Sequence, residues 1–378
     1  MKTELKKVII IGPVYPFKGG ISHYTGMMYK TLSKKYEVKM LSFKMQYPKI
    51  LFKKEQKDFQ NDSFKTENTN FIINTANPFN WMKVGHDIKK MAPDLVIFQW
   101  WHPYFSPCYW SLCKILGKIK VLFLCHNVFP HERFPFDQIL TKKVLMQGDY
   151  FIIQSRMDKD DLKGIKPDAK CIQTVHPTYN AFKFKNMARA EARRMLNLNE
   201  NERVLLFFGF VREYKGLKHL LKAMSILKET GMDAKLLVVG DFGDDKQDYI
   251  DLIQSLKIED TLEIYDGYIP DKEVEKYFAA CDLVVLPYES ATQSGIVQIA
   301  YGFEKPVVVT AVGGLPDVVK DGKTGYIVEP NNPNAISQAI VKYFQEEASE
   351  KFKMHIQDEA YKYSWDRMLE TIETLYES

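Results

Sequence analysis

Short runs of Val, Ile, Leu and Phe recur along the chain, and helix-like stretches separate them. An apolar run without polar alternation is typical of a strand that is buried on both faces, as in a parallel sheet covered by helices. The sequence therefore predicts an α/β fold. The expected strands are Val8–Ile11, Leu95–Gln99, Val121–Cys125, Tyr150–Gln154, Val204–Phe208, Leu236–Val239, Leu262–Tyr265, Leu283–Leu286 and Val307–Thr310.

The length of the chain, 378 residues, exceeds that of one ordinary domain and suits two α/β domains of similar size. Hydrophobic residues make up 46% of the sequence, which is enough for two cores and too much for a disordered chain. We expect the boundary near His176–Asn180, with an N-terminal domain at 1–180 and a C-terminal domain at 181–360. Beyond the boundary, Met187–Leu198 has the pattern of a charged amphipathic helix.

The N-terminal stretch Met1–Ile11 places lysines before an apolar run, as a signal peptide does. The run is too short for that and leads into Gly12–Pro13, so a first strand explains it better. No apolar run approaches the roughly 20 residues that span a membrane. The five scattered cysteines are expected to be core thiols in a reducing cytoplasm. A net charge of +4 without a basic and aromatic repeat gives no support to a nucleic-acid partner.

The stretch Phe207–Leu217 joins an expected strand to a helix-like stretch, Leu217–Lys228. Gly209 allows a close turn at the end of the strand, and Arg212 and Lys215 lie beside the start of the helix. Ligands of open parallel sheets bind outside the carboxyl ends of the strands. Helix N–H groups and two cations at that place favour a diphosphate. The alternative is a basic surface turn.

A second loop of the same kind follows the expected strand Leu283–Leu286, which ends at Pro287. Small and polar residues, Ser290–Ser294, lead to Gly295, which opens a helix that carries Gln298. Because both loops suit a phosphate and both follow a buried strand, the second strengthens the interpretation of the first.

These two loops stand in order with four further turns: Gly240–Asp241, Gly267–Ile269, Gly313–Pro316 and Asp321–Gly325. In this order they resemble the carboxyl-terminal domain of the family 4 nucleotide-sugar glycosyltransferases, which have the two-domain B-type fold. The resemblance is dense in the C-terminal half of the chain and loose in the N-terminal half. It implies two Rossmann-like domains that face each other across a cleft. It also implies that a helix within residues 361–378 crosses back to the N-terminal domain.

The resemblance implies a retaining glycosyltransferase that moves a hexose-type sugar from a nucleoside-diphosphate sugar to a glycan or lipid-linked glycan acceptor. Bacterial surface polysaccharide synthesis is the expected setting. Arg212 and Lys215 would stabilise the departing diphosphate, and His126 would lie near the transferred sugar. Because the protein's own cations take the place of a metal, neither a metal nor another cofactor is expected. The donor-binding residues that the resemblance implies are Gly19, Gly20, Gly209, Tyr268, Ile269, Glu289, Ser290, Ser294, Gly295, Ile296 and Gln298.

The sequence departs from the family at one point. Most members have two glutamates eight residues apart across the second loop, and the corresponding residues here are Ser290 and Gln298. Glu289 is the neighbour that could replace the first glutamate. The departure favours an inactive scaffold or regulatory protein as an alternative, although the cations and glycines are intact. An epimerase or a phosphorylase of the same fold is a further alternative, and the chain is short for a phosphorylase.

The N-terminal half offers acceptor-side features. Gly19 and Gly20 precede an expected helix and either approach a ligand closely or form a flexible turn. His126 follows an expected strand and is either a functional or a structural histidine. His131 and Glu132 either join it or belong to an ordinary loop.

Two further patterns have two interpretations each. The aromatic residues Trp100–Phe105, with Trp110, either stack on a sugar or pack in the core. Asp158–Asp160 matches an Asp-x-Asp metal motif, but Ser155 before it suits an N-cap, so we expect a solvated helix start.

Lys34–Lys35 and the segment Lys44–Lys54 mix cations with large apolar groups, which suits either an exposed loop or the surface of an anionic membrane. We expect peripheral association of a cytoplasmic protein with the inner face of the membrane.

Overall fold

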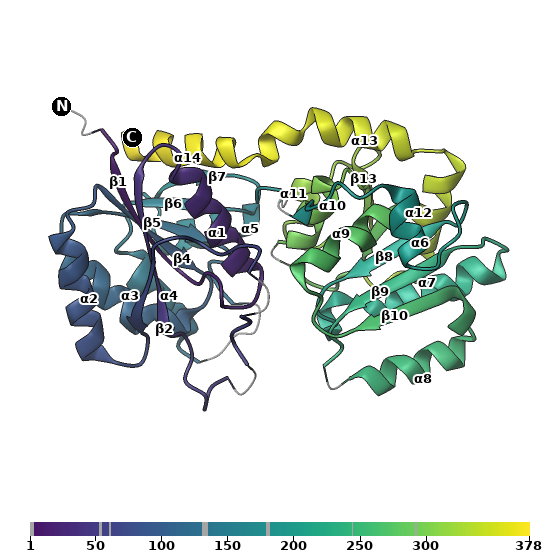
Figure 1. The fold of residues 1–378 in the computed structure, drawn as a ribbon, viewed down its shortest axis with the longest axis horizontal. Coiled ribbons are helices and arrows are strands. Elements are labelled where there is room, and N and C mark those ends of the chain that lie inside the picture. The colour runs from purple at the N-terminus through teal and green to yellow at the C-terminus, as the bar shows by residue number, and fades with distance from the viewer. Residues whose placement is uncertain are drawn as a thin grey trace. The chain divides into compact units, whose positions relative to one another are not determined.

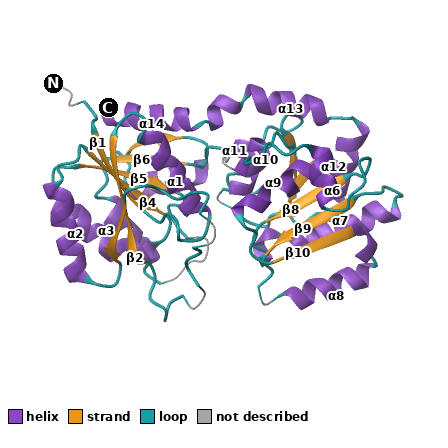
Figure 2. Cartoon of the chain, viewed as in Figure 1, coloured by secondary structure: helices purple, strands orange, loops and turns teal. Residues whose placement is uncertain are grey.

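A computed structural model describes residues 4–52, 55–59, 62–130, 135–178, 182–243, 245–291 and 293–378. The chain divides into two compact units (Figure 1): unit 1 is Met1–Val175 with Ser364–Ser378, and unit 2 is His176–Tyr363. Each unit is a parallel sheet with helices packed against it (Figure 2). The predicted α/β fold with two Rossmann-like domains is confirmed.

The sheet of unit 1 has the strand order β3-β2-β1-β4-β5-β6-β7, and the order reverses between β1 and β4. Its strands are β1 Lys7–Ile11, β2 Glu37–Met45, β3 Thr69–Asn74, β4 Leu95–Trp100, β5 Lys120–Cys125, β6 Tyr150–Ile153 and β7 Lys170–Gln173. Its helices are α1 Gly20–Leu32, α2 Pro78–Lys90, the short 3-10 helix η1 Pro103–Phe105, α3 Ser106–Leu116, α4 Asp137–Leu145, α5 Arg156–Ile165 and α14 Trp365–Glu377.

Alternate residues of each strand in unit 1 enter different cores, because successive side chains point to opposite faces. Ile9 and Ile11 pack in the core beneath α2, α3, α4 and α5. Val8 and Ile10 pack on the other face, with residues of α1 and α14. Both faces of the sheet are therefore covered, which explains why its central strands β1, β4, β5 and β6 are largely apolar.

The sheet of unit 2 has the order β10-β9-β8-β11-β12-β13 and reverses between β8 and β11. Its strands are β8 Val204–Phe208, β9 Lys235–Gly240, β10 Leu262–Asp266, β11 Leu283–Leu286, β12 Val307–Thr310 and β13 Gly325–Val328. Its α-helices are α6 Arg189–Met195, α7 Leu217–Glu229, α8 Lys246–Leu256, α9 Asp271–Ala280, α10 Gly295–Gly302, α11 Leu315–Val318, α12 Pro333–Gln345 and α13 Ser349–Asp358, and its 3-10 helices include η3 Glu213–Lys215, η4 Glu259–Thr261 and η5 Ala360–Tyr363.

All nine predicted runs are strands, and the predicted helix at Met187–Leu198 is present as the shorter α6. Strands β2, β3, β7 and β13 were not predicted. β3 and β7 are edge strands with few buried positions, so neither has a continuous apolar run. Four of the five cysteines are buried, and none forms a disulfide. In the described ranges, no helix combines the length and the apolar character needed to cross a bilayer.

Candidate active site

Two loops meet at the carboxyl edge of the unit 2 sheet. One follows β8 and the other follows β11, and these strands are neighbours at the point where the strand order reverses. Connections leave such a point in opposite directions, which opens a crevice where ligands of α/β sheets bind. The two motifs that the sequence presented separately thus form one site.

Two glycines allow the loop after β8 to lie close to the loop after β11 and to α10. Gly216 has φ +64°, and a Cβ there would lie 2.0 Å from the backbone oxygen of Pro287. Gly209 has φ +109°, and its Cβ would lie 3.6 Å from Ile296 Cδ1 on α10. The backbone N–H of Glu289 donates to the oxygen of Tyr214 across 2.7 Å, which ties the second loop to the first.

The predicted cations Arg212 and Lys215 lie half-buried in the first loop. Lys215 Nζ donates to the hydroxyl of Tyr288 at 2.8 Å and lies 4.0 Å from the centroid of that ring. Arg212 Nη1 donates to the backbone oxygen of Val211 at 2.8 Å. Within the described part of the chain neither cation forms an ion pair with a carboxylate. Two cations without acidic partners suit an anionic ligand.

Tyr288 is a site residue that sequence reasoning missed. It is fully buried, and its hydroxyl lies 3.3 Å from Ser294 Oγ while it accepts from Lys215. Its backbone oxygen accepts from Thr310 Oγ1 at 2.6 Å, which fixes it against β12. Tyr288 therefore connects Lys215 to the start of α10. An aromatic residue directly after the proline that ends a buried strand was the available signal.

The start of α10 offers donors to a ligand. Ser294 is its N-cap, and Gly295 and Ile296 form its first turn, where backbone N–H groups lack intrahelical acceptors. Gln298 lies one turn further and is fully buried. Among the described residues, neither Oε1 nor Nε2 of Gln298 has a hydrogen-bond partner. Because buried amides are nearly always paired, Gln298 has unused bonding capacity in this site.

The side chain of Glu289 is bound to α7. Its carboxylate lies 2.9 Å from Lys218 Nζ and 2.9 Å from His219 Nε2. Burial raises the pKa of the Glu289 carboxyl, but the hydrogen bonds from Lys218 and His219 outweigh it, and the pKa lies below its ordinary value. Ser290, at the position of the family's first glutamate, is exposed.

Tyr268 and Ile269 follow β10 at the same edge of the sheet. Tyr268 is exposed and Ile269 is half-buried. The preceding Gly267 donates to the oxygen of Gly240 at the end of β9. Gly240 in turn packs so closely on Gly209 that a Cβ would lie 1.9 Å from the oxygen of Gly209. The loops after β10, β9 and β8 therefore form a continuous row.

The acceptor-side residues belong to unit 1. Gly19 is the N-cap of α1 with φ +106°, and Gly20 is the first residue of that helix. His126 follows β5 and is buried, with Nε2 2.8 Å from Gln99 Oε1. Its ring meets the edge of Tyr24 at a centroid distance of 4.8 Å. His131 and Glu132 lie outside the described residues.

Asp158 corrects one expectation. Ser155 caps α5 as predicted and accepts from the backbone of Asp158 at 3.0 Å. The solvated helix start is wrong for Asp158, which is buried and accepts from the backbone N–H of Val128 at 2.7 Å. Burial raises the pKa of Asp158 to about 6. Asp158 thus anchors the loop that carries His126.

The aromatic residues near β4 divide into two groups. Trp100 and Phe105 are fully buried in the core of unit 1, so packing accounts for them. Trp101, Tyr104 and Trp110 are only partly buried against the same core.

Residues 188–363 match the family described as Glycosyl transferases group 1. Unit 2 is a glycosyl transferase group 1 domain. The loops after β8 and β11 lie within this group 1 domain, and so do the glycines that join the loops after β8, β9 and β10.

The chain is also similar to curated proteins that are named as glycosyltransferases. The chain is 29% identical over 189 residues to an uncharacterized glycosyltransferase of Methanocaldococcus jannaschii, over 49% of this chain and 47% of that protein. It is 26% identical over 274 residues to a D-inositol 3-phosphate glycosyltransferase of Actinosynnema mirum, over 69% of this chain and 64% of that one. The chain thus spans about half the length of the first relative and less than two thirds of the second.

Solved structures share the fold over the whole chain. A glycosyltransferase from Rickettsia africae has a TM-score of 0.75 and 18% identity and covers 99% of this chain and 98% of its own. Anabaena Alr3699/HepE in complex with UDP has a TM-score of 0.74 and 16% identity, over 98% of this chain and 100% of its own. The group 1 domain and the N-terminal unit together therefore have the B-type glycosyltransferase fold.

Proposed function

We propose that the chain is a retaining glycosyltransferase that moves a hexose-type sugar from a nucleoside-diphosphate sugar to a glycan or lipid-linked glycan acceptor. The observation that carries the proposal is the pair of cations in the loop after β8, Arg212 and Lys215, which have no acidic partners among the described residues. Lys215 is connected through Tyr288 to the start of α10. The group 1 family and the structural neighbour with bound UDP support it.

The diphosphate binds where the N–H groups of Gly295 and Ile296 meet the two cations. Breaking the sugar–phosphate bond leaves negative charge on the diphosphate and positive character on the sugar. Lys215 is held by Tyr288 before the reaction, so it stabilises the developing charge without reorganisation. The departing phosphate then accepts the proton of the acceptor hydroxyl. In this proposal the protein's own cations do the work of a metal, and no cofactor is required.

We assign the other predicted site residues roles in binding the donor and the acceptor. Gln298 binds the ribose hydroxyls with its unused amide, and Tyr268 and Ile269 face the nucleotide base. Gly19 and Gly20 receive the donor phosphates and the acceptor, and His126 lies near the transferred sugar. Glu289 is already bonded to Lys218 and His219, so we assign it a positioning role between α7 and the second loop. Ser290, not Glu289, then stands where the family's first glutamate would contact the sugar.

The proposed setting is bacterial surface polysaccharide synthesis, by a cytoplasmic protein that associates peripherally with the inner face of the membrane. One of the two segments expected to mediate this, Lys44–Lys54, is described except for residues 53–54. In the other, Lys35 pairs with Glu373 of α14 at 2.6 Å, so it is not a free cation.

Product analysis with a panel of nucleotide sugars tests the proposal. A transferase releases nucleoside diphosphate and joins the sugar to an acceptor or to water. An epimerase changes the sugar without releasing nucleoside diphosphate, and a scaffold changes nothing. Thermal stabilisation by UDP, GDP or ADP, lost in a Lys215→Ala variant, identifies the base and confirms that the ligand occupies this site. A parent protein that releases no nucleoside diphosphate from any donor would contradict the proposal.

A further inference from the structure

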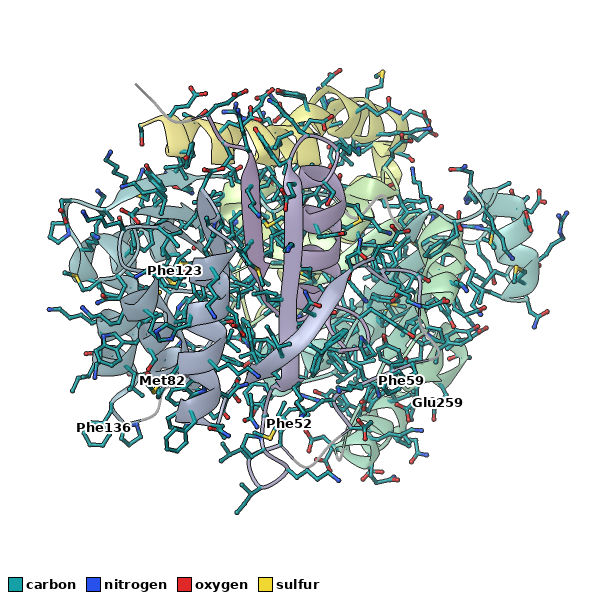
Figure 3. The ribbon with its side chains drawn as sticks, turned by 60° about the vertical axis from the view of Figure 1, so that its left-hand side comes forward. Phe52, Phe59, Met82, Phe123, Phe136 and Glu259 are labelled. Carbon is teal, nitrogen blue, oxygen red and sulfur yellow. The ribbon has the colours of Figure 1, made fainter. Side chains whose placement is uncertain are left out.

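Five large apolar side chains of unit 1 are exposed on α2, on α4 and at the ends of α4. Phe79 and Met82 belong to α2 and are 84% and 54% exposed. Phe136, Ile139 and Met146 belong to or flank α4 and are 72%, 64% and 46% exposed. Figure 3 shows Met82 and Phe136 on the same side of the unit. We call these five residues the α2–α4 face. Monomeric proteins rarely expose large apolar groups together without a binding partner.

A cavity of about 190 Å³ joins the two helices. It is lined by Trp81 of α2, by Leu140 and Lys143 of α4, and between them by Ser106, Pro107, Trp110 and Ser111 of α3. Lys143 Nζ lies 4.3 Å from the ring centroid of Trp110. The exposed apolar groups of α2 and α4 therefore flank a shared hollow with two indole rings in its wall.

Helical spacing explains why these groups face solvent. On α2, Val84 and Ile88 turn into the core, and Phe79, Met82 and Lys83 lie on the opposite side of the helix. On α4, Val144 and Leu145 are buried, while Ile139 and two lysines are exposed. The exposed side of each helix is thus both apolar and cationic, with lysines beside the apolar groups.

The positive charge of α2, α3 and α4 indicates which kind of partner the α2–α4 face would bind. α2 carries three lysines, α3 one and α4 two, against one aspartate on α2 and one buried aspartate on α4. A second copy of the chain would place lysines against lysines across a two-fold axis. An anionic bilayer instead accepts the apolar groups below its headgroups and the lysines at its phosphates. Tryptophan is also suited to that boundary, because its ring is apolar and its N–H is polar.

We infer that the α2–α4 face docks unit 1 on an anionic phospholipid bilayer. The inference deepens the proposed peripheral association and rests on the proposed function for its purpose, which is access to a lipid-linked acceptor. It also relocates the contact from Lys44–Lys54 to a surface built from three packed helices.

Vesicle co-sedimentation of the full chain tests this inference. The parent protein should bind equimolar phosphatidylcholine–phosphatidylglycerol vesicles, bind pure phosphatidylcholine vesicles weakly, and lose binding as salt rises. A Phe79→Gln/Ile139→Gln variant should bind the anionic vesicles at least about tenfold more weakly, because it lacks two apolar side chains that would enter the bilayer. Both positions are exposed, so the fold should be unaffected.

Ile50 and Leu51, which are 85% and 62% exposed, provide the matched control within the segment that the sequence favoured. An Ile50→Gln/Leu51→Gln variant should bind like the parent. Weaker binding by this control alone, or no vesicle binding by the parent, overturns the inference. Release of nucleoside diphosphate from a donor in the absence of vesicles tests the proposed function separately, and it should be equal in the parent and both variants.

Discussion

At the scale of single residues, the site depends on a cation whose position is fixed by a buried phenol. We expect Lys215→Ala or Arg212→Ala to lower turnover by about two orders of magnitude, because each fixed charge acts on the leaving group. Lys222→Ala, an exposed lysine of α7, is the matched control and should retain full turnover. The measurements are steady-state kinetics and thermal melting. A Lys215→Ala protein that is folded and as active as the control would show that the first loop is only a basic surface turn.

Tyr288 permits a finer test of the same contact. Tyr288→Phe keeps the buried ring and removes the hydroxyl that accepts from Lys215. We expect turnover to fall by about tenfold and the free energy of unfolding by about 1 kcal/mol, the usual contribution of one hydrogen bond. In a Lys215→Ala background the same substitution should change turnover little, since the two residues act as a unit. Additive effects in this double-mutant cycle would mean that Tyr288 does not position Lys215.

We predict that Gln298 forms hydrogen bonds to the ribose hydroxyls of the donor nucleotide. One amide oxygen and one NH2 group can bond both hydroxyls, one as acceptor and one as donor. Gln298→Ala should therefore raise the dissociation constant of the donor and leave the KM of the acceptor unchanged. Calorimetry with ribo- and 2′,3′-dideoxy-nucleotides provides the control. If the variant still discriminates between them as strongly as the parent, Gln298 is only a buried helix residue.

At the scale of elements, a buried carboxyl joins α5 to the loop after β5. Burial raises the pKa of Asp158 to about 6, above the value of about 4 in an unfolded chain. The native state holds this proton more tightly, so the stability contributed by the carboxyl is present below pH ~4 and is lost as the pH rises through about 6.

Asp158→Asn removes this titration while it keeps an oxygen for the N–H of Val128. The free energy of unfolding of the parent should therefore fall relative to that of the variant between pH ~4 and pH ~6. Urea denaturation across this range is the measurement, and Asp160→Asn, an exposed neighbour, is the control. Parallel pH profiles for the parent and Asp158→Asn would contradict the assignment.

The elements also show what a sequence can predict. β8 and β11 are buried on both faces and so leave continuous apolar runs, whereas the edge strand β3 has two exposed residues and leaves none. The glycines and cations of the site were predictable because their geometry is local. The contact of Lys215 with Tyr288 was not, because it depends on β8 lying beside β11. The burial of Asp158 likewise depends on Val128, which comes from another loop.

At the scale of the whole molecule, unit 1 consists of two separate stretches of chain. The helix α14, yellow in Figure 1, contributes Met368, Ile372 and Leu375 to the core beneath α1. Unit 2 is continuous, and its two ends lie side by side, since the N–H of Thr178 donates to the oxygen of Tyr363 at 2.7 Å. In topological terms, unit 2 is an insertion within unit 1.

This arrangement sets an order of events during synthesis. The ribosome releases the strands of unit 1 first, then all of unit 2, and only afterwards the residues of α14. Until α14 is made, apolar residues on one face of the unit 1 sheet, such as Tyr24 and Met28, are incompletely covered. Unit 2 can fold around its own core before then. Unit 1 is thus begun before unit 2 and completed after it, and until α14 is made its partly covered face is a candidate for chaperone protection.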